Sequence, residues 1–140
     1  MARLTVEGIE GIEAQLGQLG RPMIRRIVEA GARRDAVEQR GNISAAGHRR
    51  TGSMHFNVRA AEYHEIIGGG VINVYPQDSD KKGVPNALKA FVINYGRGKR
   101  RTKRMGDKFI TGKLKQTEKA VHDAMQAESD RIISEINKGR

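Results

Sequence analysis

Apolar residues recur at helical spacing through the C-terminal part of the chain, and this pattern constrains the fold more than any other feature. Leu114, Val121, Met125, Ile132 and Ile136 fall within a narrow sector when successive residues are placed about 100° apart. Charged residues fill most of the remaining circumference. The pattern predicts a helix over residues 111–137, about 40 Å long at roughly 1.5 Å per residue.

A helix this long with so narrow an apolar stripe either overhangs a domain of 140 residues or packs along another subunit. We therefore assign Leu114, Val121, Met125, Ile132 and Ile136 to packing between subunits. A solitary surface helix is the alternative that the pattern leaves open.

The N-terminal third contains a short strand and two further amphipathic helices. Alternation predicts a strand over residues 2–7, and apolar residues at helical spacing predict a helix from Ile9 to Leu19. Pro22 suits the first turn of a second helix, predicted over 22–40. Its buried stripe begins with three aliphatic residues and then degrades, because an aspartate falls on the same side. Residues 41–53 are rich in small residues and predict a loop.

The period of the pattern changes after this loop from helix to strand. Apolar residues alternate from Met54 to Ala60, continue at Ile66 and Ile67 past an irregularity near residues 62–64, and reach a glycine triplet at residues 68–70. A return strand follows and stops at Pro76. Together these segments predict a β-hairpin.

Residues 86–95 are compatible with either helix or strand, and we favour a short buried helix. Ala87, Ala90, Phe91 and Asn94 then share its inner face. The whole chain is predicted to be one α+β domain, residues 1–140, with a small antiparallel sheet packed by helices and a long C-terminal helix.

Positive charge is concentrated in one short segment. The chain has a net charge of +10, and residues 97–108 hold seven basic side chains and one acidic side chain. Such a cluster is typical of an exposed, flexible loop that faces phosphates or an acidic partner. A solvated loop that only aids solubility is the alternative. The candidate residues for contact with DNA or a partner are Arg97, Lys99, Arg100, Arg101, Lys103 and Arg104.

A second basic surface is suggested by three arginines spaced seven residues apart. Arg26, Arg33 and Arg40 line the face of the second helix opposite its apolar stripe, and Arg49 and Arg50 follow in the next loop. This row is either the solvated side of the helix or a surface for phosphates or a neighbouring subunit.

No catalytic constellation is recognisable in the sequence. The chain has no cysteine, which excludes disulfides and thiolate chemistry, and its four histidines are scattered. His55 and His64 lie on strand-like sequence without the spacing of zinc ligands. We therefore expect no enzyme, no cofactor and no metal. No apolar run approaches the length of a membrane span, so we expect no membrane association.

Four short motifs follow one another along the chain. A basic loop ends in Arg50-Thr51-Gly52, with Met54 two residues beyond the glycine, and the hairpin follows. The segment from Ala87 ends in Tyr95-Gly96, and Phe109-Ile110 leads into the terminal helix. This order resembles the tail-completion or head-to-tail joining proteins of tailed bacteriophages, the minor tail component family. Asn94 departs from that pattern, because the family usually has an acidic residue before the aromatic-glycine pair.

The resemblance implies a non-catalytic structural protein of the virion, assembled in the host cytoplasm. It implies a homo-oligomeric ring, expected to be a hexamer, at the head–tail neck or the upper end of the tail. Its partners would be adjacent connector or tail proteins, together with non-specific contact with packaged DNA. The sequence also supports two competing hypotheses: a monomeric basic nucleic-acid-binding protein, and a small enzyme using His55 and His64.

Overall fold

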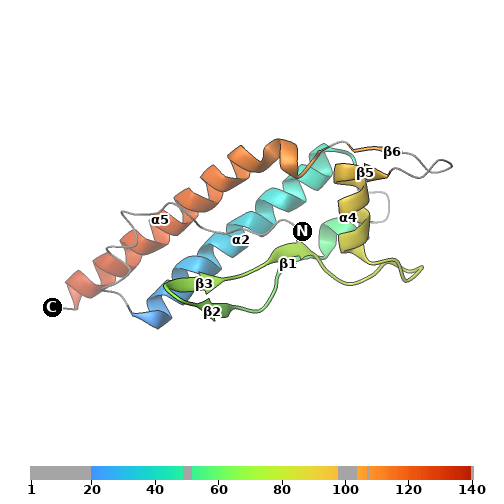
Figure 1. Ribbon diagram of the computed structural model, residues 1–140. Coiled ribbons are helices and arrows are strands. Elements are labelled where there is room, and N and C mark those ends of the chain that lie inside the picture. The colour runs from blue at the N-terminus through green and yellow to red at the C-terminus, as the bar shows by residue number, and fades with distance from the viewer. Residues whose placement is uncertain (1–19, 49–51, 98–103, 107, 140) are drawn as a thin grey trace.

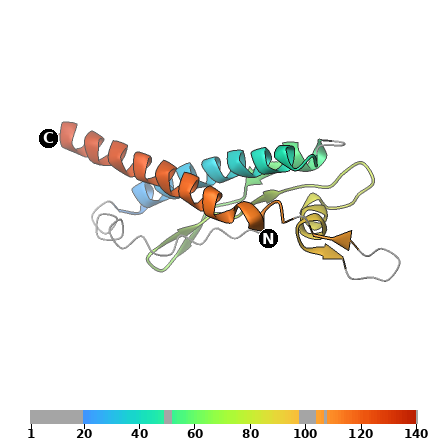
Figure 2. The same cartoon turned by 90° about the horizontal axis from the view of Figure 1, so that it is seen from above.

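The computed structural model describes residues 20–48, 52–97, 104–106 and 108–139, and two long helices dominate this part of the chain. Helix α2 (Arg21–Ala45) and helix α5 (Leu114–Lys138) lie side by side and run in opposite directions (Figure 1, Figure 2). A β-hairpin packs on α2 as well, so α2 joins the two layers. The predicted α+β class with a long C-terminal helix is confirmed.

The remaining elements are short. They are α3 (Ser53–Phe56), β1 (Val58–Ala60), β2 (His64–Ile66), β3 (Gly69–Val71), β4 (Val74–Pro76), α4 (Asn86–Tyr95), β5 (Gly96–Arg97), β6 (Arg104–Met105) and the 3-10 turn η1 (Thr111–Lys113). The antiparallel pairs are β1 with β4, β2 with β3, and β5 with β6. The predicted helix over 86–95 is confirmed, and the terminal helix begins as η1 and continues as α5.

The hairpin contains a β-bulge. Val58 pairs with Pro76 and Ala60 with Val74, whereas His64 pairs with Val71. Residues 61–63 therefore face residues 72–73, which leaves one extra residue on the first strand. This bulge is the irregularity that the sequence predicted near residues 62–64. The turn is shorter than expected, because two of the three glycines belong to β3.

The bulge brings the Tyr63 ring onto the backbone of Gly70. A Cβ atom at Gly70 would lie 2.2 Å from Cε2 of Tyr63, so only glycine leaves room for the ring. The guanidinium of Arg25 lies 5.2 Å from the centre of the same ring. Tyr63 therefore packs on Gly70 within the hairpin and links the hairpin to α2 by the cation–π contact with Arg25.

We expect Gly70→Ala to lower the free energy of unfolding by about 1–2 kcal/mol, because the ring of Tyr63 must leave both contacts. Urea unfolding followed by circular dichroism measures the loss. Gly69→Ala is the matched control, since a Cβ there meets nothing within 4 Å. Equal losses in the two variants would contradict this account of Tyr63.

Helix α2 packs against α5 and against the hairpin, and many of its buried residues are small or polar. Its buried positions are Ile27, Gly31, Ala32, Asp35, Ala36, Gln39 and Ile43. The predicted end at residue 40 was wrong, because Ile43 is 1% exposed and extends the buried stripe by another turn. Residues 41–45, predicted as a loop, therefore belong to the helix.

The start of the hairpin also differs from the sequence prediction. Residues from Ser53 to Phe56 form one helical turn, and the strand begins only at Val58. The turn follows Gly52, whose φ of 73° is left-handed, and the Asn57 side chain closes it by donating to the Ser53 carbonyl at 2.7 Å. Met54 is buried and Phe56 exposed, as their different positions on that turn dictate.

The apolar stripe of α5 faces α2 within the same chain. Val121, Met125 and Ile132 form a buried cluster with Ile27, and Ile136 packs against it. Their assignment to subunit packing was therefore wrong, because the small residue Gly31 lets α2 approach α5 closely enough to cover them. Only Leu114 stays largely outside, with 43% of its surface exposed.

Candidate functional site

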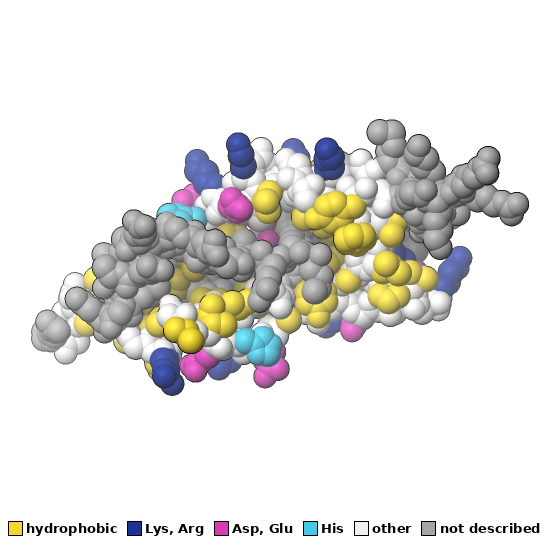
Figure 3. Space-filling view, viewed as in Figure 1, with side chains coloured by type: hydrophobic (Ala, Val, Ile, Leu, Met, Phe, Trp, Pro, Cys, Tyr) yellow, Lys and Arg dark blue, Asp and Glu magenta, His cyan; other side chains and the backbone are white. Residues whose placement is uncertain are grey.

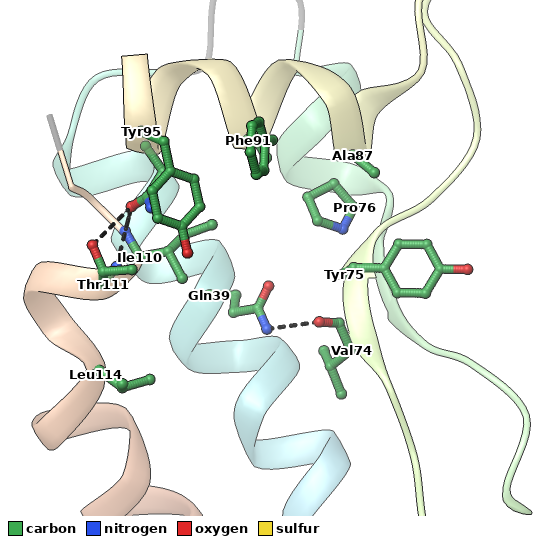
Figure 4. A pocket seen from close by; sticks show the side chains of 12 residues that line it. Gln39, Val74, Tyr75, Pro76, Ala87, Phe91, Tyr95, Ile110, Thr111 and Leu114 are labelled. Atoms are coloured by element: carbon green, nitrogen blue, oxygen red, sulfur yellow. Dashed lines mark hydrogen bonds between the residues drawn. The ribbon is translucent and has the colours of Figure 1, made fainter. Parts of the chain in front are cut away.

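An apolar pocket opens at the end of the molecule where α4, β4 and the start of α5 meet. Its volume is about 220 Å³. Figure 3 shows hydrophobic side chains gathered over this region, and Figure 4 shows the pocket from close by. The lining comes from four separate segments and comprises Gln39, Val74, Tyr75, Pro76, Ala87, Ala90, Phe91, Asn94, Tyr95, Ile110, Thr111 and Leu114.

Helix α4 exposes aromatic residues at the mouth of the pocket. Asn86, Ala90 and Asn94 form its buried face, whereas Phe91 and Tyr95 are 51% and 58% exposed. The expected burial of Phe91 was wrong, because the two asparagines hold the inner positions by hydrogen bonds. The rings of Phe91 and Tyr95 lie 4.8 Å apart and form an exposed apolar rim.

Asn94 fixes this rim to the start of the last helix. Its Oδ1 accepts hydrogen bonds from the backbone N–H groups of Ile110 at 3.0 Å and Thr111 at 3.1 Å. Its carbonyl oxygen accepts from the N–H of Lys108 at 3.1 Å. A Cβ at Gly106 would lie 2.3 Å from that oxygen, so the chain returning to α5 passes tightly over the end of α4.

The floor of the pocket contains a buried amide beside a buried carboxyl. Gln39 Nε2 donates to the Val74 carbonyl at 3.0 Å, as Figure 4 shows, and to Asp35 Oδ1 at 3.2 Å. Burial raises the pKa of Asp35 to about 6, the hydrogen bond from Gln39 lowers it in part, and Glu38 adds a further rise. Asp35 is thus held in its charged form near neutral pH at a cost in stability.

The basic segment begins and ends at the same end of the molecule as the pocket. Arg97 pairs with Arg104 across the β5–β6 ladder, which directly follows α4 (Figure 1). Sequence reasoning treated residues 97–108 as one flexible loop and missed this ladder, which two residues on each side are too short to reveal. The other four basic candidates, Lys99, Arg100, Arg101 and Lys103, lie outside the described residues.

The row of arginines on α2 does not form one basic surface. Arg26 donates to Glu128 Oε1 at 2.8 Å and to Glu135 Oε2 at 2.9 Å, and these carboxylates raise its pKa. Arg40 Nη2 donates to the Val58 carbonyl at 2.7 Å. Two of the three arginines therefore hold α2 to α5 and to the hairpin, which corrects the predicted second surface. Arg33 is exposed, and Arg49 and Arg50 lie outside the described residues.

The two histidines considered for catalysis lie in different surroundings. His55 Nδ1 lies 3.2 Å from Ser44 Oγ and 3.2 Å from the Arg40 carbonyl oxygen, whereas His64 is exposed on β2. Among the described residues there is no group of three His, Cys, Asp or Glu side chains that could hold a metal ion. No helix in the same part of the chain is long and apolar enough to cross a bilayer.

Comparison with known proteins gives no match: no family model, no curated protein and no solved structure resembles this chain significantly. The resemblance to phage tail-completion proteins thus depends on the sequence motifs.

Proposed function

We propose that this chain is a non-catalytic structural subunit of a tailed-bacteriophage particle, assembled in the host cytoplasm. It forms a homo-oligomeric ring, a hexamer in our proposal, at the head–tail neck or the upper end of the tail. Its neighbours are connector or tail proteins, and its basic segment faces packaged DNA or the acidic face of the next ring.

The open apolar pocket carries this proposal. Phe91, Tyr95 and Leu114 leave large apolar surfaces in solvent around a concave site, a feature that marks contact with another protein. A ring subunit needs such a surface on each side, because head-to-tail contacts repeat until the rotation closes.

Two of the motifs that carry the family resemblance lie around the same pocket. Tyr95-Gly96 ends α4, and Phe109-Ile110 leads into η1 and α5. Asn94, which replaces the usual acidic residue, joins these two motifs through its side chain. A neutral amide oxygen accepts the same backbone hydrogen bonds that a carboxylate would accept, so this departure leaves the connection intact.

Assembly is tested by the native mass of the purified chain and by electron microscopy of the assembled particles. Discrete closed rings support the proposal. A chain that stays monomeric up to near-millimolar concentration and binds duplex DNA tightly would favour the alternative, a monomeric nucleic-acid-binding protein. Six phosphate contacts would give that protein a log–log salt slope of about −5.

We expect charge reversal in the basic segment to abolish head–tail joining or DNA retention while the fold persists, because phosphate contacts depend on these cations. The variant carries Lys99→Glu, Arg100→Glu, Arg101→Glu and Lys103→Glu. The control reverses four exposed lysines elsewhere, Lys81, Lys82, Lys119 and Lys138, and changes the net charge equally. Particle yield and retained DNA are measured for both. Normal particles from the first variant would refute the role of the segment.

A further inference from the structure

The turn between β2 and β3 presents an apolar tip that the rest of the described chain does not cover. The ladder ends at the pair Ile66–Gly69, so Ile67 and Gly68 form a two-residue turn. Ile67 is fully exposed at 105%, and Ile66 is 52% exposed. Turns of this kind normally hold polar residues or glycine, so a β-branched apolar side chain at the tip is unusual.

The tip and the pocket lie at opposite ends of α2. Glu65 Oε2 on β2 lies 3.9 Å from Nη1 of Arg21 at the start of the helix, whereas Gln39, in the second half of the helix, forms the floor of the pocket. Eighteen residues separate these two positions, which corresponds to about 27 Å along the helix. Figure 3 shows hydrophobic side chains over both regions. The tip therefore cannot reach the pocket of its own chain.

The surroundings of the two features differ in charge. Residues 60–73 contain no lysine or arginine, and Glu62 and Glu65 are exposed on the hairpin. Arg21 of α2 lies beside Glu65, and Arg25 pairs with Glu29, so these five side chains leave one negative charge in excess near the tip. Beside the pocket, Lys108, Lys113 and Lys115 are exposed, and residues 108–117 contain no acidic side chain. Such complementarity steers two surfaces together and fixes their register.

The sizes also agree. The pocket volume is about 220 Å³. A cavity of about 150 Å³ already accommodates a benzene molecule, so a pocket of this volume accepts a branched aliphatic side chain. Its rim of Phe91, Tyr95 and Leu114 offers apolar contact to the strands on either side of the tip.

We propose that the β2–β3 tip of one copy, with Ile67 at its end, inserts into the pocket of a second copy of this chain. The contact joins two different surfaces, so repetition produces a ring or an open filament rather than a symmetric dimer. One tip in one pocket is a small interface and a weak one, and closure of a ring multiplies it. This inference rests on the proposed function, because it names the contact through which the subunits assemble.

Disulfide trapping tests the contact directly, because the chain has no cysteine of its own. Ile67→Cys and Leu114→Cys are made separately, mixed in equal amounts and oxidised with diamide. We expect a cross-linked dimer from the mixture, only background from each variant alone, and a ladder of oligomers from the double variant. Val37→Cys, at another exposed apolar position, replaces Leu114→Cys in the control mixture, which should give only background.

An association measurement provides a second readout that needs no oxidation. We expect Ile67→Asp to weaken self-association about 100-fold, or about 2.8 kcal/mol at 1.4 kcal/mol for each factor of ten. Leu114→Asp should have a comparable effect. A mixture of the two variants should form dimers and nothing larger, because only one intact tip and one intact pocket remain. Both sites are exposed, so circular dichroism should show unchanged folding.

Each other outcome would overturn the inference and identify a different occupant. Cross-linking of Ile67→Cys with itself would show that tips meet symmetrically. An intramolecular disulfide in an Ile12→Cys, Leu114→Cys monomer would assign the pocket to the N-terminal segment of the same chain. Assembly that neither aspartate variant affects would leave the proposed function standing and reject this contact, whereas a wild-type chain that never assembles would reject both.

Discussion

Replacing Asn94 with alanine will lower the free energy of unfolding by about 3 kcal/mol. The Asn94 side chain is 1% exposed and accepts hydrogen bonds from the backbone N–H groups of Ile110 and Thr111. The Thr111 hydroxyl also donates to this oxygen, with Oγ1 at 3.4 Å from Oδ1. Alanine would leave the two partly buried N–H groups without an acceptor and would create a cavity. Each unsatisfied group lowers the free energy of unfolding by about 1–3 kcal/mol.

Urea unfolding measures this loss, and hydrogen exchange locates it. We expect the Ile110 and Thr111 amides to lose their protection in the variant, because their acceptor is gone. Asn42→Ala is the matched control, since its amide makes only a 3.5 Å contact with Thr117. If the two alanine variants lost the same stability, Asn94 would not be the group that holds α5 to α4.

The conservative variant Asn94→Asp separates the acceptor from the rest of the side chain. It keeps an oxygen at the position of Oδ1, and it replaces Nδ2, which has no hydrogen-bond partner in the described part of the chain. We therefore expect it to retain the protection of both amides, although burial of the charge costs stability.

The elements with a clear hydrophobic period could be predicted from the sequence. The terminal helix occurs where its pattern placed it, and the hairpin follows its pattern from Val58 onward. In the terminal helix the apolar side chains themselves do the packing, so periodicity alone reveals the element. The helix over 86–95 also occurs, although its pattern allowed a strand as well and its buried face consists of Asn86, Ala90 and Asn94.

The extent of α2 could not be predicted in the same way. Its buried positions include Gly31, Ala32, Asp35 and Gln39, none of which appears as an apolar stripe. They are buried because the side chains on these faces of α2 are short. Met125 on one side and the hairpin on the other can therefore approach the helix closely. Such burial depends on contacts between elements far apart in the sequence, which no local pattern records.

The candidate site was missed for a related reason. Its lining comes from α2, β4, α4 and the segment that starts α5, and no motif connects these segments. Leu114 was placed in the helix stripe and Phe91 in the core, yet both lie at the pocket. The available signal was the pair Asn86 and Asn94, which flank Ala90 at intervals of four residues and mark the buried face of α4.

Replacing Asp35 with asparagine will raise the free energy of unfolding at pH 7.5 by about 2 kcal/mol. In the unfolded chain this carboxyl has its ordinary pKa of 3.8, whereas burial raises the pKa to about 6 in the folded protein. Between these values the folded state binds more protons than the unfolded state, so stability falls as the pH rises. A pKa displaced this far lowers the free energy of unfolding by about 3 kcal/mol above pH 6, compared with a pH below 3.8. Burial of the new amide N–H groups removes part of that gain.

The pH dependence distinguishes this effect from a general loss of negative charge. The wild-type chain should lose stability between pH 4 and pH 6 at this group, and Asp35→Asn should lack that loss while keeping the hydrogen bond from Gln39. Glu29→Gln removes one charge from an exposed ion pair with Arg25 on the same helix, and this variant should still lose stability between pH 4 and pH 6. The free energy of unfolding of all three proteins is measured by urea unfolding at a series of pH values. If Asp35→Asn retained the wild-type slope, the carboxyl would not be buried in its charged form.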